Sequence, residues 1–302
     1  MSMQYVYLVP GFFGFTSLGS MNYFLGVRET LETRLGEMGV RAVIHETDTL
    51  PTGSIRQRAV RLLKRIEQDG AVKNGGGIHF VGHSTGGLDA RLLVSPGVKL
   101  VPSDIEEEIG RRVYSVQTLS TPHYGTPLAG FFATIEGKHV LHLLTMLATT
   151  RPGRLGITAT AKYLSLVARL DNLTGKANTL LDPLSEQLIK IISMERGHQL
   201  WKFLNEISQD QGAVIQLAPE SMDIFNAAVI NREGVRYVSH ISASPPPFKE
   251  ARLSNLNSLY APLALLLYAT VYKITARENR SYPYPVLKEE DRRALSSRLG
   301  LE

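Results

Sequence analysis

The sequence predicts an α/β fold, in which a mostly parallel sheet is flanked by helices and interrupted by one helical insertion. Short apolar runs alternate with stretches of helical periodicity over residues 5–119, and a further run follows near residue 235. Most of these runs are continuously apolar, as expected for parallel strands that are covered on both faces. Over residues 131–226 the periodicity is helical, with no clear strand pattern.

Five apolar runs are expected to form the strands. They are Tyr5–Val9, Ala42–Ile44, Ile78–Val81, Val113–Leu119 and Val235–Ile241. Between the second and third runs, residues 54–68 place apolar side chains on one helical face with arginine and lysine opposite. Ser54 is expected to cap this helix at its N-terminus, and another helix is expected directly after Ser84.

The composition excludes several classes of site. A chain of 302 residues can fill one α/β domain with an inserted cap. It has no cysteine, which excludes disulfides, thiolate catalysis and cysteine-ligated metals. The net charge of +5 comes from scattered basic residues without interleaved aromatic side chains, so no nucleic-acid partner is expected.

The chain ends and apolar runs bear on localisation. The N-terminus leads directly into a predicted strand, without the basic and apolar regions of a signal peptide. The longest uncharged apolar run, Leu259–Tyr272, is shorter than the about 20 residues that a membrane-spanning helix needs. With the absence of cysteine, these features predict a cytoplasmic protein without a transmembrane anchor. They do not indicate its oligomeric state.

The strongest motif is GHSTGG at residues 82–87, which contains the pattern G-x-S-x-G. It follows an apolar run and precedes a helical pattern, and this strand–turn–helix context is typical of a nucleophile elbow. Ser84 is therefore expected to be a nucleophile whose backbone is strained so that the hydroxyl is exposed. We expect only glycine to fit at Gly82 and Gly86, because strand and helix approach closely there.

A second motif, LVPGFFGF at residues 8–15, follows the first strand. Acyl transfer needs two N–H donors directed at the developing oxyanion. One normally comes from the residue after the nucleophile, here Thr85. The other comes from a loop after an early strand, where Phe12 is the best candidate.

A third motif, LSTPHYGTP at residues 119–127, ends the fourth strand at the edge that faces the nucleophile. His123 is therefore expected near the site. The interpretation favoured for it is a hydrogen-bonded loop histidine that shapes the pocket, rather than a catalytic group.

With these three motifs in order, the sequence resembles the bacterial triacylglycerol lipases of the α/β-hydrolase superfamily. Its oxyanion loop is similar to their proline-glycine variant, and residues 217–226 and 234–239 resemble the family's return from cap to sheet. The resemblance implies an α/β-hydrolase core over residues 1–130 and 227–302, with a helical cap or lid over residues 131–226. It also implies hydrolysis of small-molecule lipid or apolar esters through an acyl-serine intermediate. The family's calcium sites lie near the part of the pattern that is missing here, so we expect no metal, and we expect no cofactor.

The sequence departs from the family near its end. The family pattern has a late aspartate, commonly in Asp-Gly, and then a histidine, but here Asp291 is the only aspartate after Val235 and the last histidine is His240. Three explanations are open. The chain is an N-terminal fragment; or a relocated histidine such as His123 or His240 is the base; or the fold is inactive and binds a lipid or a partner. An acyltransferase or thioesterase would use the same elbow.

Overall fold

The computed structural model describes the residues that form the sheet and most of its flanking helices. These are residues 2–12, 14, 17–18, 21–129, 210, 212–244, 246–247, 269, 272–273, 275–276, 282 and 288–299. All further structural statements refer to this part of the chain.

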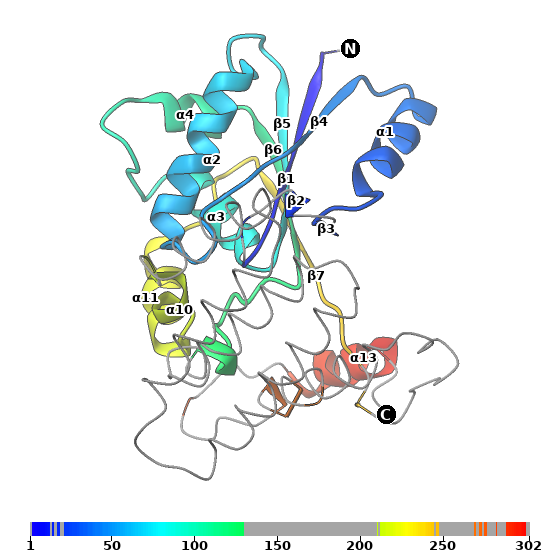
Figure 1. Cartoon of the computed structure of the whole chain (residues 1–302), viewed down its shortest axis with the longest axis vertical. Helices are drawn as coiled ribbons and strands as arrows, with labels where there is room; N and C mark the ends of the chain where they lie inside the picture. The colour runs from blue at the N-terminus through cyan, green and yellow to red at the C-terminus, as the bar shows by residue number, and fades with distance from the viewer. Residues whose placement is uncertain are drawn as a thin grey trace, which may run out of the picture.

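The core is a five-stranded sheet in which every neighbouring pair of strands is parallel (Figure 1). The strand order is β4-β1-β5-β6-β7. The strands are β1 (Gln4–Val9), β4 (Ala42–Glu46), β5 (Gly77–His83), β6 (Val113–Leu119) and β7 (Arg236–His240). All five predicted strands are confirmed. A parallel sheet of this order, covered by helices and with a sharp turn to a helix after its central strand, gives the chain an α/β-hydrolase fold.

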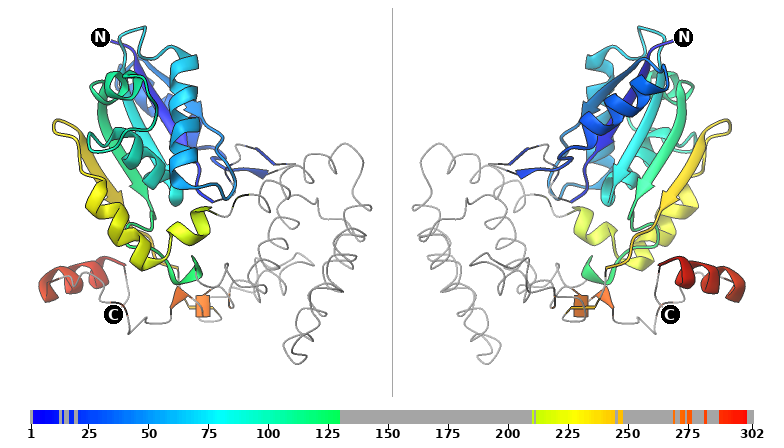
Figure 2. Two further views of the ribbon diagram at one scale, coloured as in Figure 1. Left: turned by 90° about the vertical axis from the view of Figure 1, so that its left-hand side faces the viewer. Right: turned by 90° about the vertical axis from the view of Figure 1, so that its right-hand side faces the viewer.

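Helices cover both faces of the sheet. The described helices are α1 (Val27–Glu37), α2 (Ile55–Asp69), α3 (Thr85–Val94), α4 (Ile105–Gly110), α10 (Gly212–Gln216), α11 (Pro219–Ala228) and α13 (Glu289–Leu299). Of these, α13 lies apart from the sheet (Figure 1). The two side views show α2 and α3 on one face and α1 on the other (Figure 2). Two short strands, β2 (Ser17–Leu18) and β3 (Met21–Asn22), pair separately as an antiparallel ribbon.

The core divides according to the alternation of side chains along β1, because successive side chains of a strand point to opposite faces. Tyr5, Tyr7 and Val9 pack in the larger cluster, which includes the apolar faces of α2 and α3. Val6 and Leu8 pack in a smaller cluster on the α1 side.

Helix α2 forms where the sequence predicts it. The Ser54 hydroxyl accepts a hydrogen bond from the Gln57 N–H at 3.3 Å, which caps the N-terminus. Gly70, with φ 71°, ends the helix in a left-handed conformation that favours glycine. The five apolar residues of its stripe are buried: Ile55, Ala59, Leu62, Leu63 and Ile66. The expectation that all basic residues lie opposite is wrong for Arg58, which is completely buried.

The expected insertion is described only at its end. Up to residue 209 it lies outside the described residues. Helix α10 and most of helix α11 fall within the expected 131–226 range, and Leu217 and Met222 in this part belong to the main core cluster. This final part of the range therefore packs with the sheet. No helix among the described residues is both long and apolar enough to cross a membrane.

Candidate active site

Ser84 forms the turn between β5 and α3 by itself. β5 ends at His83 and α3 begins at Thr85, and Ser84 between them has φ 53° and ψ −128°. Its N–H donates to the Leu119 carbonyl at the end of β6 at 2.9 Å, and its carbonyl accepts from the Gly87 N–H at 3.2 Å. A non-glycine residue with positive φ is strained, and such strain is characteristic of functional turns. The hydrogen bonds on both sides hold Ser84 in this conformation.

The two glycines that flank Ser84 permit close packing of three segments. A Cβ at Gly82 would lie 2.5 Å from the Gly87 nitrogen. A Cβ at Gly86 would lie 2.2 Å from the Val9 carbonyl oxygen, which belongs to the end of β1. Neither contact is sterically allowed, so any side chain would push α3 away from the sheet.

We therefore expect Gly86→Ala to destabilise the protein by about 2 kcal/mol or more, because a backbone carbonyl cannot move aside without displacing β1. Gly36→Ala is the matched control: Gly36 is also helical, and a Cβ added there would have no neighbouring atom within 4 Å. That change should stabilise the protein by about 0.5–1 kcal/mol, since alanine favours a helix over glycine. Urea unfolding of both variants measures the difference, and equal stabilities would contradict this packing.

The loop after β1 lies directly against Ser84. A Cβ at Gly11 would be 2.5 Å from the Cβ of Ser84. Phe12 follows in a turn that is closed by the Gly14 N–H, which donates to the Gly11 carbonyl at 3.0 Å. Thr85 is buried and is the first residue of α3, so its N–H has no acceptor inside that helix. The structure thus brings the segments of Phe12 and Thr85 together beside Ser84.

Tyr23 also holds this loop. Its hydroxyl accepts a hydrogen bond from the Gly11 N–H at 2.9 Å and lies 2.6 Å from Nδ1 of His83. Burial raises the pKa of Tyr23 and lowers the pKa of His83. A protonated phenol and a neutral imidazole therefore lie next to Ser84, and the phenol fixes the peptide at Gly11.

Arg58 of α2 connects this loop to α3. Its guanidinium donates to the carbonyl oxygens of Pro10 at 2.8 Å and Gly11 at 3.1 Å, and also to that of Leu50. Nη2 lies 2.8 Å from Oδ2 of Asp89 on α3, and both side chains are fully buried. Burial raises the pKa of Asp89 to about 6, although Arg58 opposes this rise. Sequence analysis did not identify either residue as part of the site.

The two histidines considered as relocated bases have other partners. Nδ1 of His123 accepts from Nη1 of Arg91 at 3.0 Å, and Nε2 lies 3.1 Å from the Thr118 hydroxyl. Nε2 of His240 lies 2.9 Å from the Gln117 side-chain oxygen. In the described part of the chain, no histidine makes a hydrogen bond to the Ser84 hydroxyl. The explanation of a relocated base at these two positions therefore receives no support.

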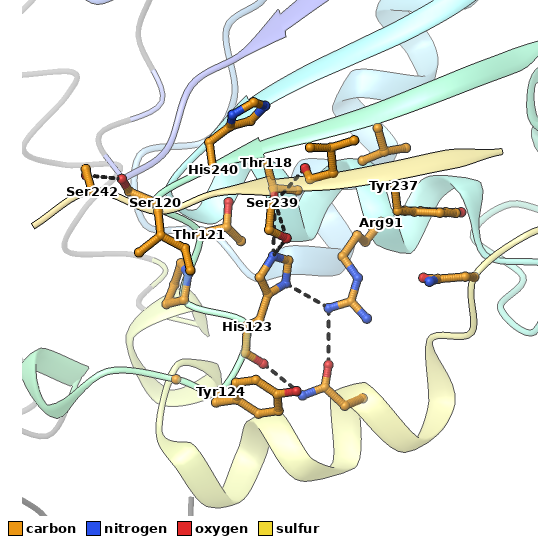
Figure 3. A pocket seen from close by; sticks show the side chains of 17 residues that line it. Arg91, Thr118, Ser120, Thr121, His123, Tyr124, Tyr237, Ser239, His240 and Ser242 are labelled. Atoms are coloured by element: carbon orange, nitrogen blue, oxygen red, sulfur yellow. Dashed lines mark hydrogen bonds between the residues drawn. The ribbon is translucent and has the colours of Figure 1, made fainter. Parts of the chain in front are cut away.

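His123 lines a cavity of about 650 Å³ between β6, β7, α3 and α11 (Figure 3). Its backbone carbonyl accepts from the Asn226 side chain at 2.8 Å, which fixes the loop. Burial, together with the charge of Arg91, lowers the pKa of His123 to about 4, so the ring is neutral at pH 7. Its hydrogen bonds and position are those of a loop histidine that shapes a pocket.

Ser120 is a second strained serine that sequence analysis did not identify. It has φ 48°, and Ser84 and Ser120 are the only non-glycine residues with positive φ in the described ranges. Its N–H donates to the His240 carbonyl at 2.8 Å, and its hydroxyl lies 2.6 Å from that of Ser242. It follows Leu119, which accepts from Ser84, so both strained residues lie at the same sheet edge.

Comparisons with known proteins find triacylglycerol lipases that are similar to part of the chain. No protein-family model matches the sequence. A triacylglycerol lipase of Vibrio cholerae is 35% identical over 98 residues, which are 32% of this chain and 30% of the relative. A triacylglycerol lipase of Pseudomonas fragi is 28% identical over 124 residues, 41% of this chain and 36% of that protein. The matches thus span about a third of these relatives.

Solved structures of lipases and esterases are also similar. EstA from Clostridium botulinum has 18% sequence identity and a TM-score of 0.46, covering 92% of this chain and 69% of that one. The Staphylococcus hyicus lipase has 18% identity and a TM-score of 0.43, covering 77% of this chain and 64% of that lipase.

Proposed function

We propose that the chain is a serine ester hydrolase of the lipase or carboxylesterase type, which acts on lipid or other apolar esters. The observation that carries this proposal is the geometry of Ser84. The serine is held at φ 53° between a central strand and a helix N-terminus, with the glycine loop after β1 packed against its Cβ. An ordinary surface serine would not need this strain or the glycines around it.

In the proposed reaction, the Ser84 hydroxyl oxygen attacks the ester carbonyl and transfers its proton to a base. The N–H groups of Thr85 and Phe12 stabilise the oxyanion of the tetrahedral intermediate. Its collapse breaks the ester bond, and the leaving alcohol takes the proton back, which leaves an acyl-serine. A water molecule, deprotonated by the same base, then attacks the acyl group, and free acid and Ser84 are released.

The base is the residue that this scheme still requires, because a serine hydroxyl is a weak nucleophile at neutral pH. The described histidines all have neighbours other than the Ser84 hydroxyl, so we assign the base to none of them. The positive end of the α3 dipole lies next to Ser84 and favours the negative charge of the transition state.

The test is a product assay with tributyrin in buffer that contains a primary alcohol such as methanol. We expect butyric acid as the main product, because the proposal assigns water as the acceptor. Methyl butyrate as the main product would instead indicate an acyltransferase. Cleavage of butyryl-CoA in preference to both tributyrin and p-nitrophenyl butyrate would indicate a thioesterase.

A further inference from the structure

The cavity beside His123 has a lining that the proposed ester hydrolysis does not use. The polar residues around it are one arginine, two histidines, two asparagines, two tyrosines and five serines or threonines. Among the described residues, no aspartate or glutamate lines it. Nearly all of these side chains can donate hydrogen bonds, so the cavity is suited to a ligand that accepts them.

Arg91 is the charged group of this cavity. Both of its hydrogen bonds use Nη1, which lies 3.0 Å from Nδ1 of His123 and 3.2 Å from the side-chain oxygen of Asn226. Both partners are neutral, and in the described ranges Arg91 takes part in no ion pair. The guanidinium also lies 5.5 Å from the ring centre of Phe225. Burial lowers the pKa of Arg91, so its charge is partly desolvated without a counter-ion.

Arg58, which is fully buried, shows how a guanidinium with a full set of acceptors is bound in this fold. Arg58 has a carboxylate partner and three carbonyl acceptors. By contrast, Nε and Nη2 of Arg91 have no acceptor among the described residues. These two nitrogens form the side of the guanidinium that binds carboxylates and phosphates with two parallel hydrogen bonds.

A second donor lies beside Arg91. Tyr237 of β7 accepts a hydrogen bond from the Arg232 N–H at 3.0 Å, which leaves its hydroxyl hydrogen for another acceptor. Figure 3 shows the Tyr237 side chain next to the Arg91 guanidinium at the cavity wall. The two donors come from helix α3 and strand β7, so they are fixed relative to each other by the core.

We propose that this cavity binds a small oxyanion, a carboxylate or a phosphate group, through Nε and Nη2 of Arg91, with the Tyr237 hydroxyl as an additional donor. The site is separate from Ser84 and does not depend on the proposed ester hydrolysis. A carboxylate would come from an acid such as the product of ester cleavage, and a phosphate from free phosphate or a phosphorylated ligand.

The test is isothermal titration calorimetry of the full chain with sodium phosphate and, separately, with sodium butyrate. Sodium chloride keeps the ionic strength constant. We expect saturable binding of at least one oxyanion, and the one that binds more tightly identifies the source. Arg91→Gln should weaken binding by about tenfold or more, because the charged fork is lost. Arg34→Gln, which removes an exposed surface charge, should leave it unchanged.

Two further variants keep the proposal falsifiable if Arg91→Gln does not fold. Arg91→Lys keeps the charge but not the fork and should weaken binding, and Tyr237→Phe should weaken it while Arg91 is intact. Ser84→Ala should bind normally. The absence of saturable heat with either anion in the wild-type chain would overturn the proposal. Equal binding by wild type and by every folded Arg91 and Tyr237 variant would overturn it as well.

Discussion

Ser84→Ala is expected to lower kcat/KM for p-nitrophenyl butyrate by a factor on the order of 10⁴–10⁶, because in the proposed mechanism it removes the nucleophile and with it most of the rate enhancement. KM should change little, since the hydroxyl contributes mainly to the reaction step. Thermal unfolding should shift by only a few degrees: alanine at φ 53° is strained about as much as serine.

Ser120→Ala is the matched control for this prediction. Ser120 is the other serine with positive φ among the described residues and lies at the same sheet edge, but its hydroxyl is hydrogen-bonded to the hydroxyl of Ser242. Its loss should leave kcat/KM within about tenfold of the wild type, as expected for a change that removes no reacting group. A comparable loss of kcat/KM in both variants would mean that substitutions at this sheet edge lower activity by disturbing the structure, not by removing a nucleophile. Full activity in Ser84→Ala would remove Ser84 from the mechanism.

Arg58→Met is expected to give the largest loss of stability, about 3–5 kcal/mol, because it leaves the buried Asp89 carboxylate without its partner. It also leaves the carbonyl groups of Pro10, Gly11 and Leu50 without this donor. The double variant Arg58→Met/Asp89→Leu should recover part of the loss, since no charge then remains buried. Urea unfolding of the single and double variants measures both effects.

Arg61→Met serves as the control on the same helix. Arg61 pairs with Asp48 at the surface, where the two side chains are 44% and 49% exposed, so its loss should cost at most about 1 kcal/mol. A similar cost for Arg58→Met and Arg61→Met would contradict the role given to Arg58 as the link between the loop after β1 and α3.

The pH dependence of Arg58→Met provides a further check on the same pair. Without Arg58, the folded-state pKa of Asp89 should rise above the already raised value of about 6. The folded state then binds a proton that the unfolded state, with its ordinary carboxyl pKa, releases. The destabilisation relative to the wild type should therefore be largest above this raised pKa. It should shrink as the pH falls toward about 6, below which Asp89 is protonated in both folded proteins.

The parts of the fold that sequence predicts are those specified by local patterns. The strands are short apolar runs, and α2 has both an apolar stripe and a serine cap, so each can be recognised within its own segment. Helix α1 was not predicted because its sequence, VRETLETRLGE, is mostly polar and none of its residues is fully buried. It is held through Leu31 and Leu35, which are only partly buried.

The residues of the candidate site and the cavity also fall into two groups: those that a local sequence pattern predicts, and those that only the tertiary fold brings together. Ser84, Gly82 and Gly86 are adjacent in a motif, and local strand–turn–helix context predicts their arrangement. Arg58 could have been recognised, because it lies three residues after Ile55 and four before Leu62 and therefore on the apolar face of α2. The contact of Arg91 with Asn226 could not, since 135 residues separate them and only the tertiary fold brings them together.

Covalent labelling shows directly whether Ser84 is a nucleophile. The wild-type chain would be incubated with a fluorophosphonate, and its mass and modified peptide determined, with Ser84→Ala treated in parallel. If Ser84 is the nucleophile, the wild-type chain should carry one adduct, on the peptide that contains Ser84, and the variant none. An adduct on a different residue, or an unmodified wild-type chain, would contradict it.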